Sequence, residues 1–347
     1  MHCQLLVPDL FWPERDSRGV YDALAIPALE QILAKGRRHA DSGPLAAESG
    51  EAWLCAFFGL DKQLDWPVAP YSLLADGGAP GGRYWLRADP VHLQLESGRL
   101  VLADGGAFSL SQQEADSFGE SLNAHFSADG LMFHAPRPDR WYLRIDTAPA
   151  LETTPLRAAV GRSIDGLMPR GPDAQAWCTR LNEVQMLLHG HPVNAMREGA
   201  GAPPINSVWL WGGGTLSAAA PVSIDAVWSQ DPFAAGLAQA ARVAARDSSA
   251  GAAGLLRASA SEGVSLIVLD QLRKAAQYDD AHGWREALQQ LERDWFAPLL
   301  AALRQERIGM LSLHGLGPAL ALSVETTRGD LRRFWRRVKP LPDYAQA

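Results

Sequence analysis

Polar side chains gather between residues 191 and 215, in the run HPVNAMREGAGAPPINSVWLWGGGT. They are His191, Asn194, Arg197 and Asn206. An arginine offers a fork of N–H donors that suits a phosphate or carboxylate, and asparagines can fix the loop that carries it. The glycines from 212 to 214 would let backbone approach a ligand closely. The segment therefore predicts one wall of an anion-binding cleft. The alternative is that these polar groups only tie the loop to a sheet by hydrogen bonds.

Carboxylates and histidines that could hold a cation follow apolar runs elsewhere in the chain. Divalent cations favour such ligands, and in parallel α/β sheets the ligands converge from the carboxyl ends of strands. Other roles are open: Asp9 can cap a helix, and the turn near 279–282 can be a solvated acidic helix start with Asp280 as its cap. The candidate metal ligands are Asp9, Asp270, Asp279, Asp280, His282 and His314.

The apolar runs and the helical periodicities around these residues predict an α/β core. Short apolar runs predict buried strands of a parallel sheet. Runs with apolar residues three and four apart predict helices between them, the first ending at Gly36. The predicted strands are 3–10, 206–213, 263–270 and 307–315, and the predicted helices are 21–36, 48–61, 176–191, 234–247 and 284–306.

Residues 83–175 show a different pattern. Residues 91–104 alternate apolar and polar side chains on both sides of Ser97-Gly98, which indicates a hairpin. An amphipathic helix at 111–126 and two strand-like pieces within 130–146 follow. We therefore expect a small α+β domain at 83–175, inserted into a discontinuous core domain of residues 1–82 and 176–347.

Composition excludes several classes of protein. The chain has 347 residues, 47% of them hydrophobic, and a formal net charge of −7. A net negative charge argues against binding nucleic acid, which needs an excess of Lys and Arg. Three scattered cysteines and no apolar run of membrane-spanning length favour a cytoplasmic protein without a membrane partner. The basic run 328–339 could contact an acidic partner, although it is more typical of a solvated helix face with Phe334 and Trp335 on its inner side.

The segment 191–215 resembles the HPVN…R…G…P-N…W-W-G segment of the archaeal type of cofactor-independent phosphoglycerate mutases, in the alkaline phosphatase superfamily. Other runs match that family in the same order along most of the chain: LLVPDLFWP, YDALAIPALEQILAKG, ESGEAWLCAFFGLD and RYWLRADPVHLQ. A smaller bacterial family of pathogenicity-factor regulatory proteins also resembles the chain. The resemblance implies an alkaline phosphatase-like fold, in which a mostly parallel sheet is flanked by helices and carries a small α+β insertion.

The resemblance also implies a chemistry that this chain keeps only in part. Mutases of the family use a serine nucleophile and two metal ions, which here would be Mn, Zn or Mg. Asp9 and His314 match expected metal ligands, while Ala275 and Leu313 stand where carboxylates are expected. The nucleophile position falls at Gly50, beside Ser49, which a helix N-cap also explains.

Two hypotheses about function follow. The first is a catalytically degenerate relative with a binding or regulatory role. It would need no cofactor, and it would keep a pocket for a small phosphorylated or carboxylated ligand through Arg87, Asn194, Arg197 and Asn206. The second is an active metal-dependent phosphomutase or phosphohydrolase that acts on small phosphorylated acids. A protein partner is not predicted.

Overall fold

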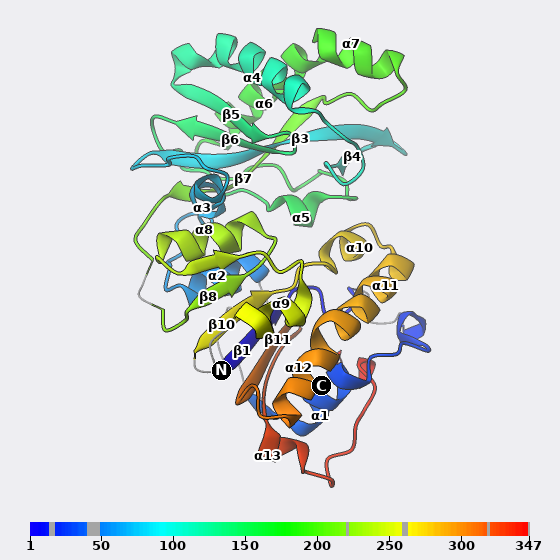
Figure 1. The fold of residues 1–347 in the computed structure, drawn as a ribbon. Helices are drawn as coiled ribbons and strands as arrows, with labels where there is room; N and C mark the ends of the chain where they lie inside the picture. The colour runs from blue at the N-terminus through cyan, green and yellow to red at the C-terminus, as the bar shows by residue number, and fades with distance from the viewer. Residues whose placement is uncertain (14–17, 40–48, 220–221, 259–262, 318–319, 346–347) are drawn as a thin grey trace. The chain divides into compact units, whose positions relative to one another are not determined.

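The computed structural model describes residues 1–13, 18–39, 49–219, 222–258, 263–317 and 320–345. Contacts divide the chain into two compact units, each of which has its own sheet (Figure 1). Unit 1 comprises residues 1–60 and 219–347, and unit 2 comprises residues 61–218. No helix among the described residues has the length and apolar character needed to cross a membrane.

Unit 1 is built on a seven-stranded sheet in the order β2-β12-β11-β1-β10-β8-β9. The neighbouring pairs from β11 to β9 are all parallel, and only β12 runs against its neighbours. The central strands are mostly apolar and buried, as expected for a parallel sheet covered on both faces. The strands are β1 (His2–Val7), β2 (Arg37–His39), β8 (Ala226–Trp228), β9 (Ala244–Arg246), β10 (Val264–Val268), β11 (Met310–Gly317) and β12 (Leu320–Thr327).

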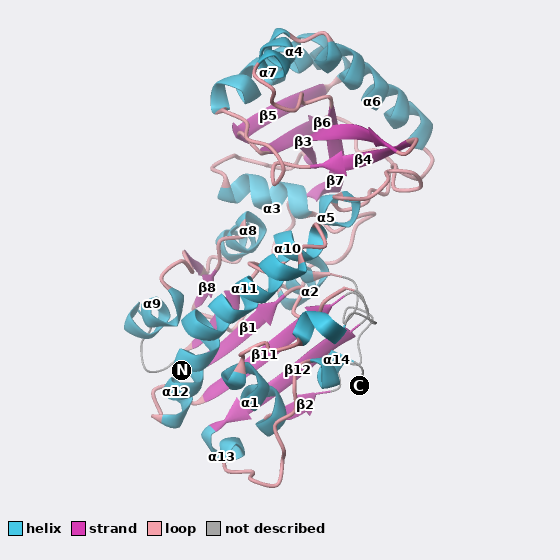
Figure 2. Cartoon of the chain, turned by 90° about the vertical axis from the view of Figure 1, so that its right-hand side faces the viewer, coloured by secondary structure: helices cyan, strands magenta, loops and turns pink. Residues whose placement is uncertain are grey.

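The helices of unit 1 bury their apolar sides against this sheet, with α1, α11 and α12 in front of β1, β11 and β12 in Figure 2. The predicted helix 21–36 begins only at Pro27, whose fixed φ suits the first helical position. No side chain at its N-cap accepts a hydrogen bond, but the Glu292 carboxylate accepts from the N–H groups of Ala28 and Leu29 at 2.7 and 3.1 Å. The helices are α1 (Pro27–Lys35), α2 (Gly50–Phe57), α8 (Pro232–Ala240), α9 (Gly251–Ala258), α10 (Arg273–Gln277), α11 (Ala281–Leu291), the π-helical turn η3 (Glu292–Phe296), α12 (Ala297–Arg304), and the short η1 (Arg18–Tyr21), α13 (Arg328–Leu331) and α14 (Pro342–Ala345).

Unit 2 contains a five-stranded antiparallel sheet, with β3 at its centre. Helices α4, α6 and α7 lie over one face of this sheet and α3 lies against the other (Figure 2). The predicted hairpin is confirmed: Ser97 and Gly98, between β3 and β4, have φ of 47° and 80°. The elements are α3 (Val68–Ala75), β3 (Tyr84–Glu96), β4 (Arg99–Ala103), α4 (Gln112–Phe126), η2 (Ser127–Asp129), β5 (Leu131–Arg137), β6 (Arg140–Ile145), α5 (Leu156–Ala159), α6 (Ala174–His189), α7 (Pro192–Gly199) and β7 (Ser207–Thr215).

The inserted unit is therefore wider than the predicted range 83–175. The predicted strand 206–213 corresponds to β7, which we assigned to the parallel sheet; it pairs with β3 in unit 2 instead. Eight of its nine residues are buried because α3 and α6 contact it. Burial on both faces produces the same continuous apolar run in a central antiparallel strand as in a parallel one, so the pattern could not distinguish them.

Candidate functional site

The N-terminus of α2 lies beside the carboxyl end of β1 in unit 1. Ser49 is the N-cap of α2, and its Oγ accepts a hydrogen bond from the N–H of Ala52 at 3.0 Å. A Cβ placed on Gly50 would lie 3.2 Å from the Pro8 ring and 3.9 Å from Nη2 of Arg273. The predicted N-cap role of Ser49 is confirmed. The position that the resemblance assigns to a nucleophile lies in the same corner as the end of β1.

Arg273, the first residue of α10, brings a positive charge to this corner. Its Nη2 lies 3.7 Å from Oε1 of Glu51 and 3.7 Å from Oδ2 of Asp231. Burial opposes the charged form of Arg273, but the carboxylates of Glu51, Asp231, Asp270 and Asp9 outweigh it and raise the pKa of the guanidinium. Asp9 follows β1, Asp231 follows β8 and Asp270 follows β10, so the ends of three parallel strands deliver acidic side chains around one arginine.

The charges at this corner are incompletely hydrogen-bonded. Oδ1 of Asp231 caps α8 by accepting from the N–H of Phe233 at 2.9 Å, but Oδ2 has no hydrogen-bond partner among the described residues. Nε of Arg273 is also buried without one in that part of the chain. Burial raises the pKa of Asp231, and Arg273 offsets this only in part. Because buried polar atoms are nearly always paired in native proteins, unpaired ones clustered at the strand ends mark this corner as the candidate site.

Asp9 and His314 both lie at the same edge of the sheet. Asp9 has a φ of 57°, which is uncommon for a residue other than glycine, and its carbonyl accepts a hydrogen bond from Nε1 of Trp284 at 2.9 Å. His314 is on β11, where Nδ1 lies 2.9 Å from Oγ of Ser323 and the ring lies 4.9 Å from that of Trp53 on α2. The neighbouring residue Leu313 is fully buried.

The other predicted ligands have local roles. Asp279 and Asp280 are exposed, and Asp280 caps α11 by accepting from the N–H of Gly283 at 2.9 Å. His282 is 83% exposed and lies 3.3 Å from Glu286 on the same helix. These residues form the solvated acidic helix start that was the alternative interpretation. Among the residues that the structure describes, no three Asp, Glu, His or Cys side chains are placed to hold a metal ion together.

The polar segment of unit 2 has internal partners for its donors. Arg197 donates from Nε to the carbonyl of Pro203 at 2.9 Å, from Nη1 to Glu114 at 2.9 Å and from Nη2 to the carbonyl of Ser109 at 3.0 Å. Asn194 donates to the carbonyls of Leu188 and Ile205, both at 2.7 Å, and accepts from the N–H of Ile205. Both side chains are buried, so the geometry supports the alternative in which they tie the loop to the sheet.

Arg87 and Asn206 are equally occupied. The amide of Asn206 pairs with both the N–H and the carbonyl of Leu93, at 2.7 and 2.9 Å, which extends the ladder between β3 and β7. Arg87 donates to Oδ1 of Asp89 at 3.1 and 2.6 Å and lies over the rings of Tyr142 and Trp211. Anion binding by these four residues stays a prediction, and it would require them to exchange internal partners for the ligand.

Two of the three glycines of β7, Gly212 and Gly214, also have a structural explanation. A Cβ on Gly212 would lie 2.9 Å from Val68, and one on Gly214 would lie 2.6 Å from Pro67, at the start of α3. The close approach that we predicted for a ligand is made here by α3. His191 caps α7 by accepting from the N–H of Val193 at 3.2 Å, and burial lowers its pKa, which favours the neutral ring that this bond requires.

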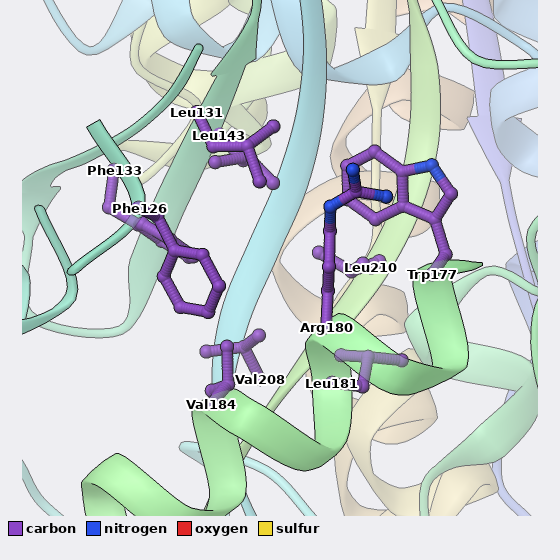
Figure 3. Close-up of a pocket in the computed structure, with 10 residues that line it drawn as sticks. All are labelled: Phe126, Leu131, Phe133, Leu143, Trp177, Arg180, Leu181, Val184, Val208 and Leu210. Carbon is purple, nitrogen blue, oxygen red and sulfur yellow. The ribbon is translucent and has the colours of Figure 1, made fainter. Parts of the chain in front are cut away.

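An apolar pocket in unit 2 offers no room for a ligand. Figure 3 shows its lining, in which side chains of α4, α6 and three strands converge. Its volume is about 10 Å³, which is space for one water molecule at most. It is a packing gap in the core of unit 2.

Sequence reasoning missed the central residues of the candidate site. Nothing in the sequence singles out Arg273, because its surroundings, RKAAQ, look like an ordinary helix start. Asp231 follows a strand of only three residues, too short for a periodicity signal, although Ser-Gln-Asp-Pro is a helix-start pattern that could have identified it. Glu51 is buried on a helix that reads as apolar, and nothing in its local pattern indicates its role.

Comparison with known proteins shows a distant relationship to one group of enzymes. The chain is 27% identical over 208 residues to a 2,3-bisphosphoglycerate-independent phosphoglycerate mutase of Methanosarcina mazei, which covers 57% of this chain and 50% of that protein. It is 28% identical over 210 residues to the mutase of Methanosarcina acetivorans, covering 58% and 51%. The chain thus spans about half the length of these curated relatives. No family profile matches it.

One solved structure supports the fold. PH0037 from Pyrococcus horikoshii matches with a TM-score of 0.59 at 12% identity, covering 94% of this chain and 87% of that one. A cofactor-independent phosphoglycerate mutase from Thermoplasma acidophilum matches with a TM-score of 0.46 at 15% identity, covering 99% and 94%. The fold class predicted from the sequence, a mostly parallel α/β sheet flanked by helices together with an α+β unit, is confirmed. The chain is therefore a distant relative, at low identity, of proteins named as phosphoglycerate mutases.

Proposed function

We propose that this chain is a catalytically degenerate relative of the 2,3-bisphosphoglycerate-independent phosphoglycerate mutases that acts as a binding or regulatory protein. The observation that carries the proposal is Arg273. Its guanidinium lies among the carboxylates at the strand ends, 3.7 Å from both Glu51 and Asp231. At that distance, in a partly buried corner, the guanidinium attracts the two carboxylates electrostatically, as a bound divalent cation would otherwise do.

The donor set at the strand ends does not fit a two-metal centre. Such a centre needs several oxygen or imidazole ligands around each ion, with the ions about 3.5–4 Å apart. Here Leu313 is fully buried next to His314, and an arginine faces Glu51 and Asp231. A metal bound at this corner would have to displace a positively charged side chain, so we derive no reaction step through a metal.

A specific feature also favours a second candidate, an active phosphomutase or phosphohydrolase. Ser49 lies at the N-terminus of α2 beside Gly50, which faces Pro8 and Arg273. A hydroxyl at a helix N-terminus, next to a residue that faces a guanidinium, is an arrangement suited to receiving a phosphoryl group. In that case Arg273 would contact substrate.

One assay separates the two candidates. Interconversion of 3-phosphoglycerate and 2-phosphoglycerate is measured with the wild-type chain, with and without added Mn²⁺, Zn²⁺ or Mg²⁺. We expect no turnover under any of these conditions. Turnover that disappears in Ser49→Ala and survives in Asp280→Ala, a variant that lacks a cap on another helix, would overturn the proposal and favour the active enzyme.

A further inference from the structure

A second pocket lies in unit 1, at the edge of the sheet formed by β2. It has a volume of about 400 Å³, and its lining comes from the C-terminal end of α1, from β2 and from the segment that leads into α14. Figure 2 shows these elements at the same edge of the unit. The charged side chains that line it are all basic: Arg38, Arg336, Arg337 and Lys339.

The basic run was expected to form a helix face with its aromatic residues inside. The structure contradicts this interpretation, because the helix α13 ends at Leu331. Phe334 is 86% exposed and Trp335 is 65% exposed. Asp330, which accepts a hydrogen bond from Thr327 at the start of α13, also pairs with Arg333 at 2.7 Å. The side chains beyond Leu331 therefore do not share one helix face. Part of this segment packs against the C-terminal end of α1.

Part of the positive charge has an internal role. Nη1 of Arg336 donates to the carbonyls of Lys35 and Gly36 at the end of α1, where helix carbonyls lack partners within the helix. Arg38 lies over the Tyr344 ring, with 5.0 Å between the guanidinium and the ring centroid. For Arg337 and Lys339, by contrast, the described structure gives no ion pair with any carboxylate.

The nearby carboxylates do not line this pocket. Asp330 pairs with Arg37 and Arg333, and Glu30 accepts a hydrogen bond from the N–H of Leu341. Asp343 is exposed next to Tyr344 and does not line the pocket. Four cations thus share one concave surface on which the described lining carries no acid, in a chain whose net charge is −7. Like charges held together repel one another, and a bound anion would remove that repulsion.

The geometry points to a phosphate group as the ligand: we propose that this basic pocket binds the phosphate of a small phosphorylated compound or of a lipid headgroup. Its volume is in the range of small-molecule sites. Guanidinium forks and an ammonium group are the side chains that bind phosphate most effectively. Burial raises the pKa of Tyr344, so its hydroxyl stays protonated and can donate as well. This proposal does not depend on the function proposed above.

Calorimetric titration with pyrophosphate tests the proposal on the full chain. We expect one site per chain in the wild type. The double variant Arg337→Gln/Lys339→Gln should weaken binding by about tenfold or more, because two charge-assisted contacts are lost. The matched control Arg307→Gln/Arg332→Gln removes the same charge from exposed residues outside the pocket and should leave affinity within about twofold. Circular dichroism and thermal melts show whether each variant is folded.

A vesicle arm identifies the source of the phosphate. Binding to vesicles containing phosphatidic acid, but not to phosphatidylcholine alone, assigns a lipid headgroup if the Arg337/Lys339 variant abolishes it and pyrophosphate competes with it. Binding of pyrophosphate without vesicle binding assigns a soluble ligand. The proposal is overturned if neither binds, or if the pocket variant and its control weaken binding equally.

Discussion

The charged corner of unit 1 and the polar segment of unit 2 differ in how completely their groups are paired. In unit 2, all three guanidinium nitrogens of Arg197 donate to a carbonyl or a carboxylate, at distances of no more than 3.0 Å. In unit 1, the contacts of Arg273 with Glu51 and Asp231 are 3.7 Å long. Nε of Arg273 and Oδ2 of Asp231 have no hydrogen-bond partner among the described residues. The conspicuous sequence motif is thus well-paired scaffold, whereas the inconspicuous residues form the poorly paired site.

This difference shows why an unusual motif is a weak guide to a binding site. A loop with prolines and glycines needs polar side chains to satisfy its backbone, and Asn194 and Asn206 both bond to main-chain groups. Those residues can be retained for folding alone. Charge that is buried without full pairing destabilises the fold, so its presence needs another explanation, such as a ligand.

Removing Arg273 should have the largest effect on stability. Arg273→Ala removes the guanidinium that faces the buried carboxylates of Glu51 and Asp231, which we expect to cost about 3–5 kcal/mol of unfolding free energy near neutral pH. Urea melts of the variant and the wild type measure this. Arg273→Lys keeps the charge and should recover most of the loss.

The loss should also depend on pH. Burial already raises the folded-state pKa of Asp231, and Arg273 lowers it, so the variant should raise it further. A carboxyl with a raised folded pKa favours folding in its protonated form, and that contribution is lost as pH rises through the folded pKa. The cost of Arg273→Ala should therefore shrink as pH falls toward the ordinary Asp value. A cost that is the same at every pH would contradict the charge explanation.

Arg197→Ala should have a smaller effect. Burial raises the pKa of Glu114, but hydrogen bonds from Ser111 and Arg197 outweigh it and lower the pKa, so the cost of this variant should shrink only at acid pH, where Glu114 is protonated. Three hydrogen bonds from one buried side chain are lost, for an expected cost of about 1–3 kcal/mol. Titration with 3-phosphoglycerate should give the same result for the variant and the wild type. If the variant keeps the stability of the wild type but no longer binds an anion that the wild type binds, Arg197 has the binding role predicted from the sequence.

Ser49 should behave as a cap. Ser49→Ala removes the bond to the N–H of Ala52, at a cost of about 1 kcal/mol, and Ser49→Asp should restore the stability because aspartate also caps. Thermal melts of the two variants check this. If Ser49→Asp is as unstable as Ser49→Ala, the hydroxyl has a role other than capping.

The smallest effect should come from His282. Its side chain is 83% exposed and pairs with the exposed Glu286, so His282→Ala should change the free energy of unfolding by no more than about 0.5 kcal/mol. Added Mn²⁺ should not change its melting temperature relative to the wild type. A metal-dependent difference between the two would return His282 to the candidate ligands.

The sequence predicted most of the fold and little of the site. The strands β1, β10 and β11 and the helices α1, α4 and α6 follow from apolar periodicity, which reports burial directly. The assignment of β7 failed because burial on both faces looks the same in either kind of sheet. The site could not be predicted because its members, Glu51, Asp231 and Arg273, are far apart in the chain, and only the order of the strands brings them together.

At the strand ends of unit 1, the guanidinium of Arg273 lies among the carboxylates where a metal ion would otherwise bind. Equilibrium dialysis of the full chain against Mn²⁺ is the most direct test of this interpretation. We expect no stoichiometric binding by the wild type and no difference between the wild type and Asp9→Asn. Two ions bound per chain by the wild type, and lost in Asp9→Asn and in His314→Ala, would contradict it and would identify the corner as a metal centre.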